Sequence, residues 1–308
     1  MQLILSSLVP IILLVILGAV LFKWAFVTPQ IRGGIDKFTY WVALPSLFVH
    51  DLADTDFAAL ETAGLLLVLV VATVAAAVVA ALVALISGLS RQRFGVFVQI
   101  GFRGNTAFVG LPLIVFAASG TDDGLVTLAL VALAALVPLN NLIAVAALVM
   151  AQQKLTLRTL ARVFGKIFTN PLIISAVIGA AIGLLGWNIP AMIDRPLELL
   201  GQTALALALV ALGGALIELN VTERMGLSIG AALFKVVAVP LITWGFALLF
   251  ALPADQAFVV MVFAACPSAT ASYILTTQLG GDDAFAAAGI VISTVLSLPA
   301  LAVVLVAF

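Results

Sequence analysis

Two basic side chains lie deep inside long apolar stretches of this sequence, where a cation needs a partner or water. Arg103 lies within Phe94–Ser119, and Lys235 lies within Met225–Leu252. An arginine or lysine at the centre of a bilayer costs at least about 2.5 kcal/mol on insertion scales, so it usually pairs or faces a wet cavity. Acidic residues occur only near the ends of the apolar stretches. The pattern predicts anion binding, with the alternative that both side chains extend to the inner surface.

A polar passage broken by glycines surrounds Arg103. Residues Gly101–Pro112 read Gly-Phe-Arg-Gly-Asn-Thr-Ala-Phe-Val-Gly-Leu-Pro, inside a stretch long enough to cross a membrane. Gly and Pro weaken the helical hydrogen-bond ladder, and the side chains of Asn105 and Thr106 can bond the backbone groups that this frees. A helix that begins beyond the break would expose its positive dipole end at mid-membrane, which favours a carboxylate.

A second interrupted passage, Ala264–Ser272, lies in the other half of the chain. Pro267 suits the first turn of a half-helix there, with Ser268 and Thr270 as local caps. Two broken hydrophobic segments in corresponding halves indicate the binding site of a transporter. The polar residues Asn141 and Ser293 occupy matched positions in two further apolar stretches. They either line the same cavity or form hydrogen bonds between helices.

Composition limits the class of protein. The chain has 308 residues, of which 65% are hydrophobic and only 9% charged, whereas soluble domains carry roughly 25% charged residues. It is therefore predicted to be an integral membrane protein. A net charge of −1 gives no basic field for nucleic acid, and the single Cys266 excludes an internal disulfide. With one histidine, His50, and no deep carboxylate pair, we expect no metal, no cofactor and no enzyme activity.

Apolar runs and charge placement predict ten membrane-spanning helices. A spanning helix needs about 20 mostly apolar residues, and cytoplasmic connections carry an excess of Lys and Arg. With ten spans and both termini outside, nearly all basic residues fall on the inner side of the membrane. The predicted spans are Leu3–Phe22, Gly33–His50, Thr62–Leu89, Phe94–Ser119, Gly124–Gln153, Ile167–Met192, Leu199–Ile217, Met225–Leu252, Gln256–Gly281 and Ala284–Phe308.

The two halves of the chain resemble one another at an offset near 160 residues. Because each half holds five spans, the second half must enter the membrane from the opposite side, which makes an inverted repeat. We therefore expect a first repeat over 1–153, a short cytoplasmic connection over 154–166 and a second repeat over 167–308, with alternating access between two bundles. The matching segments are Val9–Ile12 with Asn170–Ile173, Gly120–Gly124 with Gly280–Ala284, and Val137–Leu139 with Leu298–Ala300.

Four segments carry a resemblance to a known family. The chain resembles the auxin efflux carrier family nearly from end to end, and the first segment is the most specific of the four. The segments are Arg103–Leu113, Asn170–Ile174, Ala265–Thr270 and Ser293–Leu298.

The resemblance implies an all-α polytopic fold of ten helices in two inverted five-helix repeats, similar to bile-acid symporters and sodium/proton antiporters. It also implies that the fourth and ninth helices cross, each broken at a proline, here Pro112 and Pro267. Bacterial relatives are associated with carboxylic acids such as malonate and malate, plant relatives with the indole carboxylate auxin, and members often form homodimers. The related sodium-coupled and proton-coupled transporters have carboxylates near the crossing of these helices. In this chain, Gln256–Gly281 holds no carboxylate. Sodium coupling, proton coupling and uniport therefore remain open.

The sequence thus predicts a carrier of a small organic anion in a lipid bilayer, working by alternating access. The predicted alternative is a channel or a sensory membrane protein built on the same helical bundle. The residues expected to bind substrate are Arg103, Asn105, Thr106, Pro112, Asn141, Lys235, Pro267, Ser268, Thr270 and Ser293.

Overall fold

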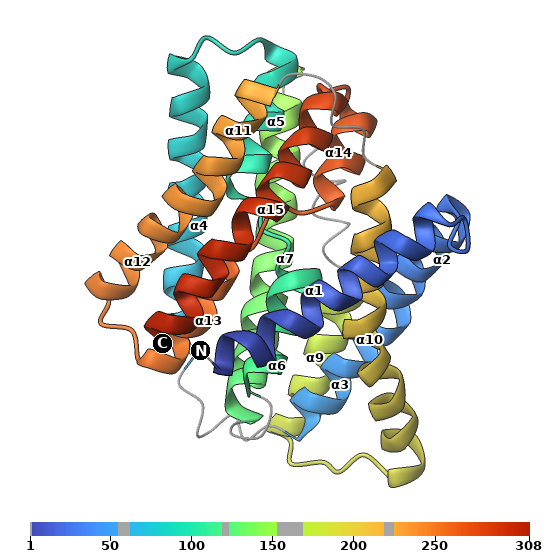
Figure 1. The fold of residues 1–308 in the computed structure, drawn as a ribbon. Helices are drawn as coiled ribbons and strands as arrows, with labels where there is room; N and C mark the ends of the chain where they lie inside the picture. The colour runs from blue at the N-terminus through green and yellow to red at the C-terminus, as the bar shows by residue number, and fades with distance from the viewer. Residues whose placement is uncertain (1, 55–61, 119–122, 153–168, 219–224) are drawn as a thin grey trace.

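The computed structural model describes residues 2–54, 62–118, 123–152, 169–218 and 225–308. These residues form helices joined by short links, with no β-strand among them (Figure 1). Five of the described helices are long and apolar enough to cross a membrane, and shorter apolar helices accompany them. The prediction of an all-helical, multi-pass membrane protein is confirmed. The expected connection over 154–166 lies outside the described residues.

The described helices follow one another along the chain. Two of the helices contain a five-residue π-helical turn. This turn is η1 between α2 and α3, and η3 between α11 and α12, and it joins the α-helical parts without a break. The elements are α1 (Gln2–Lys23), α2 (Pro29–Phe38), η1 (Thr39–Ala43), α3 (Leu44–Ala53), α4 (Ala63–Ile86), α5 (Arg91–Phe102), η2 (Thr106–Gly110), α6 (Leu111–Ala118), α7 (Asp123–Gln152), α9 (Pro171–Leu184), α10 (Ala191–Glu218), α11 (Met225–Leu233), η3 (Phe234–Ala238), α12 (Val239–Leu249), α13 (Ala254–Ala265), α14 (Ala271–Leu279) and α15 (Asp283–Ala307).

Several helix ends follow local sequence signals. Thr28 precedes Pro29 and caps α2, since its hydroxyl accepts a hydrogen bond from a first-turn amide. Asp282 caps α15 in the same way, as expected of short polar side chains at an N-cap. Gly280 ends α14 in the left-handed conformation, with φ of 76°, which glycine adopts without steric cost.

One group of helices consists of α1, α2, α3, α9 and α10, in the lower right of Figure 1. Here α1 and α10 approach so closely that glycine is required on both. A Cβ on Gly18 would lie 2.0 Å from the carbonyl oxygen of Val210, and one on Gly213 would lie 2.0 Å from that of Val15. Small residues allow such backbone-to-backbone packing between membrane helices.

The glycine pair in α11 behaves differently. The GxxxG spacing of Gly226 and Gly230 predicts a close helix contact, but nothing lies within 4 Å of a Cβ placed on either residue. That prediction is wrong, because spacing alone does not say which face of a helix meets a neighbour. Gly179 in α9 does pack closely, since a Cβ placed on it would lie 2.8 Å from the carbonyl oxygen of Phe48 in α3.

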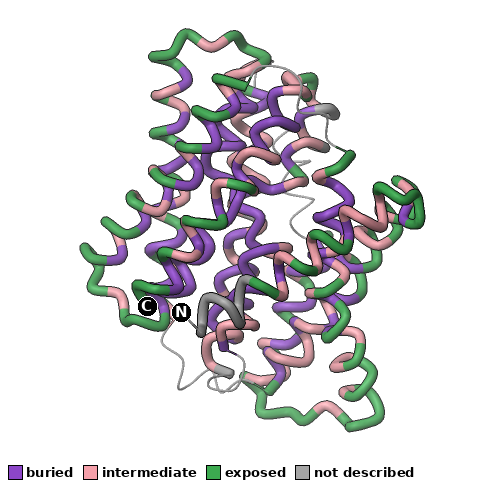
Figure 2. The backbone as a smooth tube through the Cα atoms, in the orientation of Figure 1, coloured by how far each residue is buried: buried purple, intermediate pink, exposed green. Residues whose placement is uncertain are grey.

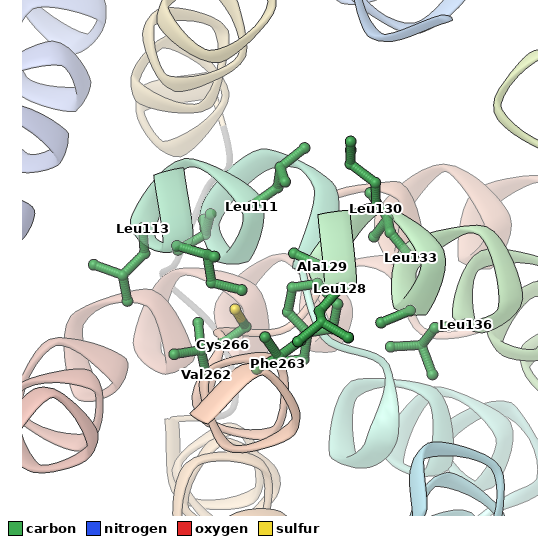
Figure 3. Close-up of a cluster of buried hydrophobic side chains, with 14 of the residues drawn as sticks. Leu111, Leu113, Leu128, Ala129, Leu130, Leu133, Leu136, Val262, Phe263 and Cys266 are labelled. Atoms are coloured by element: carbon green, nitrogen blue, oxygen red, sulfur yellow. The ribbon is translucent and has the colours of Figure 1, made fainter. Parts of the chain in front are cut away.

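The second group consists of α4, α5, α7 and α11 to α15. Its outer helices expose apolar side chains, which suits contact with lipid, and its inner helices are buried (Figure 2). A hydrophobic cluster joins the two groups. Figure 3 shows the part where Leu111 of α6 lies near Phe263 of α13 and near Cys266, which follows α13. The exposed apolar residues of α4 include Leu67, Val70, Val74, Val78, Leu82 and Leu85.

Charged side chains pair near the helix ends. Arg32 contacts both Asp36, at 2.7 Å, and Glu218 of α10, at 2.5 Å. His50 of α3 is not isolated, since its Nδ1 lies 2.6 Å from a carboxylate oxygen of Asp194 in α10. Such pairs leave the deep cations, Arg103 and Lys235, without a carboxylate partner in the described part of the chain, as the sequence predicts.

Candidate functional site

Two broken helices meet in the middle of the molecule. The first is interrupted between α5 and η2, and the second between α13 and α14. Gly104 and Ser268 form an antiparallel bridge. On either side of it, the Asn105 amide donates to the Pro267 carbonyl at 2.7 Å and the Ala269 amide donates to the Arg103 carbonyl at 3.0 Å. The two links, 103–105 and 266–270, therefore cross and satisfy one another, and we call this region the crossing.

Side chains replace the helical hydrogen bonds that the breaks remove. In a continuous helix, the carbonyls of Ile100 and Ala264 would accept from amides four residues ahead. Instead, the Ser268 hydroxyl donates to Ile100 at 2.7 Å, and the Lys235 ammonium donates to Ala264 at 2.5 Å. The Ser268 amide donates to the Ser293 hydroxyl at 3.0 Å. Buried backbone groups at membrane depth need such partners.

Glycine allows the close approach at the crossing. A Cβ on Gly110 would lie 2.8 Å from the Phe263 ring and 2.9 Å from the Cys266 sulfur. A Cβ on Gly104 would lie 3.0 Å from the Phe263 carbonyl oxygen. A larger residue at Gly110 would push η2 away from α13, so the glycines of the sequence motif have a packing role.

Arg103 is buried at the crossing with part of its donor capacity unused. Arg103 is only 8% exposed. Its Nη2 donates a hydrogen bond to the Asn141 side-chain oxygen at 2.7 Å. Its Nη1 has no hydrogen-bond partner within the described ranges, and the same holds for the side-chain nitrogen of Asn105. Buried donors without partners are costly. Their presence at one place is therefore typical of a site that receives acceptor atoms from a ligand.

Tyr40 and Asn170 are two residues connected to Arg103 that the sequence reasoning did not assign to the site. The Tyr40 hydroxyl, in η1, interacts electrostatically with Arg103 and shares a side-chain hydrogen bond with Asn170. Asn170 also caps α9, because its side-chain oxygen accepts from the Leu172 amide at 2.9 Å. The Asn-Pro start of α9 was a visible signal of this cap, but no spacing rule connects it to Tyr40 or Arg103. Arg103 thus faces the first group of helices.

A small cavity of about 30 Å³ lies on the Lys235 side of the crossing. Thr106, Asn140 and Lys235 line it, while Arg103 does not. The side-chain oxygen of Asn140 is buried and has no partner among the described residues. Lys235 therefore lines this cavity and Arg103 does not, so the two deep cations do not share it.

Gln99 is a further polar contact that the sequence reasoning missed. It is fully buried in α5, and its side-chain nitrogen donates to the Ser272 carbonyl at 3.0 Å and to the Thr276 hydroxyl at 2.5 Å. It therefore joins α5 to α14 above the crossing. Its signal in the sequence was a lone amide one helical turn before Arg103.

Most of the predicted site residues come together at the crossing, with three differences in detail. Pro112 lies in the first turn of α6, beyond η2, so the chain breaks at residues 103–105 and not at this proline. Pro267 precedes α14 and is not in its first turn, because the extended chain there pairs with Asn105. Thr270 stands at the N-cap of α14 without a side-chain cap hydrogen bond, and Ser268 bonds Ile100 instead of capping.

Comparison with known proteins places the whole chain in one family. A family model described as membrane transport protein matches residues 3–305. The chain has no significant match among curated proteins. Since the matched region includes both broken helices and nearly the entire sequence, the chain belongs to the membrane transport protein family, which is the auxin efflux carrier family.

Proposed function

We propose that this membrane transport protein carries a small organic anion, a carboxylate such as malonate, malate or an auxin-like indole acid. The observation that supports this most directly is the buried guanidinium of Arg103, whose Nη1 lacks a partner in the described chain. A guanidinium can hold a carboxylate through two parallel hydrogen bonds. The absence of a described carboxylate beside Arg103 leaves that role to a ligand.

Other groups at the crossing would orient the anion. The side-chain nitrogen of Asn105 is the second buried donor without a partner. Asn141 holds the other end of the Arg103 guanidinium at 2.7 Å, which limits its rotation. Such preorganised donors in a site of low dielectric bind charge more strongly than the same groups in water.

The position of Arg103 supports transport by alternating access, because it lies between the two groups of helices. It belongs to the group of α5 and α7, whereas Tyr40 and Asn170 belong to the group of α2, α9 and α10. An anion bound there would contact both groups, so their relative motion would change the side to which it is exposed. A secondary carrier and a uniporter would both use this geometry.

We extend the proposal to the topology. Ten spans, arranged as inverted repeats over 1–153 and 167–308, would give two bundles of this kind, with both termini outside a bacterial cytoplasmic membrane. In the proposed repeat, α1 corresponds to α9 and α3 corresponds to α10. The observed packing of α1 against α10 and of α3 against α9 supports the repeat, because the two contacts are then equivalent. Cysteine labelling of single sites in intact cells would test the orientation of each connection.

Binding to the purified protein tests the proposed anion site. We expect malonate, malate or indole-3-acetate to raise the melting temperature of the wild type and of the control Arg195→Ala, whose side chain is exposed at a helix end. Arg103→Ala should lose this response and keep its monodisperse profile, and Arg103→Lys should retain part of it. Unchanged affinity in Arg103→Ala would refute the proposal, and single-channel currents would identify a channel instead.

A further inference from the structure

Lys235 is a fully buried amine for which anion binding at Arg103 provides no role. It is 0% exposed and lies in η3, a π-helical turn between α11 and α12. Such π-helical insertions are frequent at functional sites. Its Nζ donates to the Ala264 carbonyl at 2.5 Å, which is the carbonyl left open by the break of α13. The ammonium therefore stands at the negative end of a helix dipole.

The neighbourhood of Lys235 holds no carboxylate within the described ranges. The elements packed against η3 are α5, α11, α12, α13 and α15. The titratable group that interacts with Lys235 is the thiol of Cys266. The remaining charged residues on these elements stand near helix starts, where they are exposed or half-exposed. They are Arg91 and Arg93 of α5, Asp255 of α13 and Asp283 of α15.

The cavity next to Lys235 could serve an amine that gains and loses a proton. Its volume of about 30 Å³ suits a single water molecule. Lys235 and Thr106 line it, and so does Asn140, whose buried side-chain oxygen has no partner in the described residues. A lysine ammonium has three donors. The Ala264 carbonyl takes one, and the cavity offers acceptors for the others.

We propose that Lys235 is the proton-binding residue of this carrier, so that one proton travels with each organic anion. This inference rests on the proposed function. When the cavity opens to one side, water donates a proton to the neutral amine, which becomes an ammonium. When it opens to the other side, the ammonium returns that proton to water, and no bond other than N–H is made or broken. A lysine can do this because its amine loses a proton far more readily than a guanidinium does.

The shared crossing explains why proton and anion would move together. Thr106 lines the Lys235 cavity and follows directly after the link that carries Arg103 and Asn105. A protonated Lys235 adds positive charge beside the anion site, which favours anion binding, and a neutral Lys235 favours release. The loaded carrier therefore holds anion and proton, and the empty one holds neither. This arrangement needs no carboxylate between Gln256 and Gly281, in agreement with the sequence there.

Proton movement in liposomes tests the inference separately from the proposed function. The wild type would be reconstituted around an internal pH dye, with the membrane potential clamped, and given radiolabelled malonate, malate or indole-3-acetate outside. Exchange of labelled for unlabelled carboxylate measures the proposed function. Acidification of the interior measures coupling, and we expect about one proton per anion. Absence of any exchange would refute the proposed function, whereas exchange without acidification would refute only the present inference.

Two substitutions and a control identify the residue. We expect Lys235→Arg, which keeps the positive charge, to retain exchange and to lose acidification, because a guanidinium does not release its proton near neutral pH. Lys235→Met, which is neutral, should exchange more slowly and should also lose acidification. Lys37→Met removes an exposed lysine and should behave as the wild type. Lys235→Arg also covers the case in which the methionine variant fails to fold. Acidification at the wild-type ratio in either Lys235 variant would overturn the inference, as would loss of exchange in both when they remain monodisperse.

Discussion

The contact between α1 and α10 and the crossing of the two broken helices are both tight, but they are built in opposite ways. At the first contact, Gly18 and Gly213 remove side chains so that continuous helices touch through their backbones. At the crossing, polar side chains such as Ser268 and Lys235 replace hydrogen bonds that the backbone has lost. The first contact leaves no polar group to be satisfied, whereas the crossing retains unused donors.

This difference separates stability from function. A continuous membrane helix satisfies its own backbone, so α1 and α10 need only shape complementarity to associate. The crossing gives up that internal satisfaction and retains buried donors on Arg103 and Asn105 without partners in the described chain. We therefore expect substitutions at the glycine contact to unfold the protein and substitutions at the crossing to weaken binding of the anion.

The largest effect is expected for Gly213→Ala in α10. The added methyl group would lie 2.0 Å from the Val15 carbonyl oxygen, so α1 must move, at a cost of about 1–3 kcal/mol or more. Thermal unfolding in detergent would show a markedly lower melting temperature. The matched variant Gly230→Ala, with open space around the new methyl group, should be no less stable than the wild type. Equal loss in both variants would contradict the packing argument.

Asn141→Asp should sharpen the contrast by damaging the proposed site while keeping the fold. The new carboxylate would stand 2.7 Å from the Arg103 guanidinium and compete with a bound anion. We expect affinity for the carboxylate to fall by more than about tenfold, which corresponds to about 1.4 kcal/mol. Asn141→Gln, which keeps a neutral amide, serves as the matched variant. Titration calorimetry would measure the affinities, and tighter binding in Asn141→Asp would exclude direct competition.

Ser268→Ala tests whether the crossing contributes to stability at all. The substitution removes the donor to the Ile100 carbonyl, and a buried acceptor without a partner costs about 1–3 kcal/mol. The melting temperature should fall by less than in Gly213→Ala, because no atoms collide. Thr294→Ala, at a half-buried position whose hydroxyl bonds the Ile290 carbonyl within α15, should have little effect. A larger loss for Ser268→Ala than for Gly213→Ala would reverse the comparison.

The smallest effect is expected for Tyr40→Phe. The phenol oxygen interacts with Arg103 and Asn170, but Asn170 would still cap α9 through its other side-chain atom. We expect an unchanged melting temperature and a carboxylate affinity reduced by a few fold, as for the loss of one polar contact of about 1 kcal/mol. Radiolabelled carboxylate binding would measure it. An affinity equal to that of the wild type would place the anion away from the first group of helices.

The sequence located the breaks better than it described them. Hydropathy with Gly and Pro marked Gly101–Pro112 and Ala264–Ser272, and the two cations followed from charge in an apolar segment. The first helix breaks before Pro112 and not at it. Pro267 does lie in the second break, but not in the first turn of α14 as predicted, because local propensity does not include the pairing of Asn105 with Pro267. Tyr40 escaped detection for a similar reason, since its neighbours Arg103 and Asn170 are distant in sequence.

By itself, the sequence determined that the protein is a multi-pass helical membrane protein, where two of its helices break, and that Arg103 and Lys235 are deep. These are consequences of hydropathy, of Gly and Pro in the backbone, and of charge, all of which are local. Only the tertiary structure decided that Gly104 pairs with Ser268 and that Arg103 bonds Asn141 while Lys235 bonds Ala264. Each of these contacts joins different helices, so each depends on how the helices pack and not on any one segment.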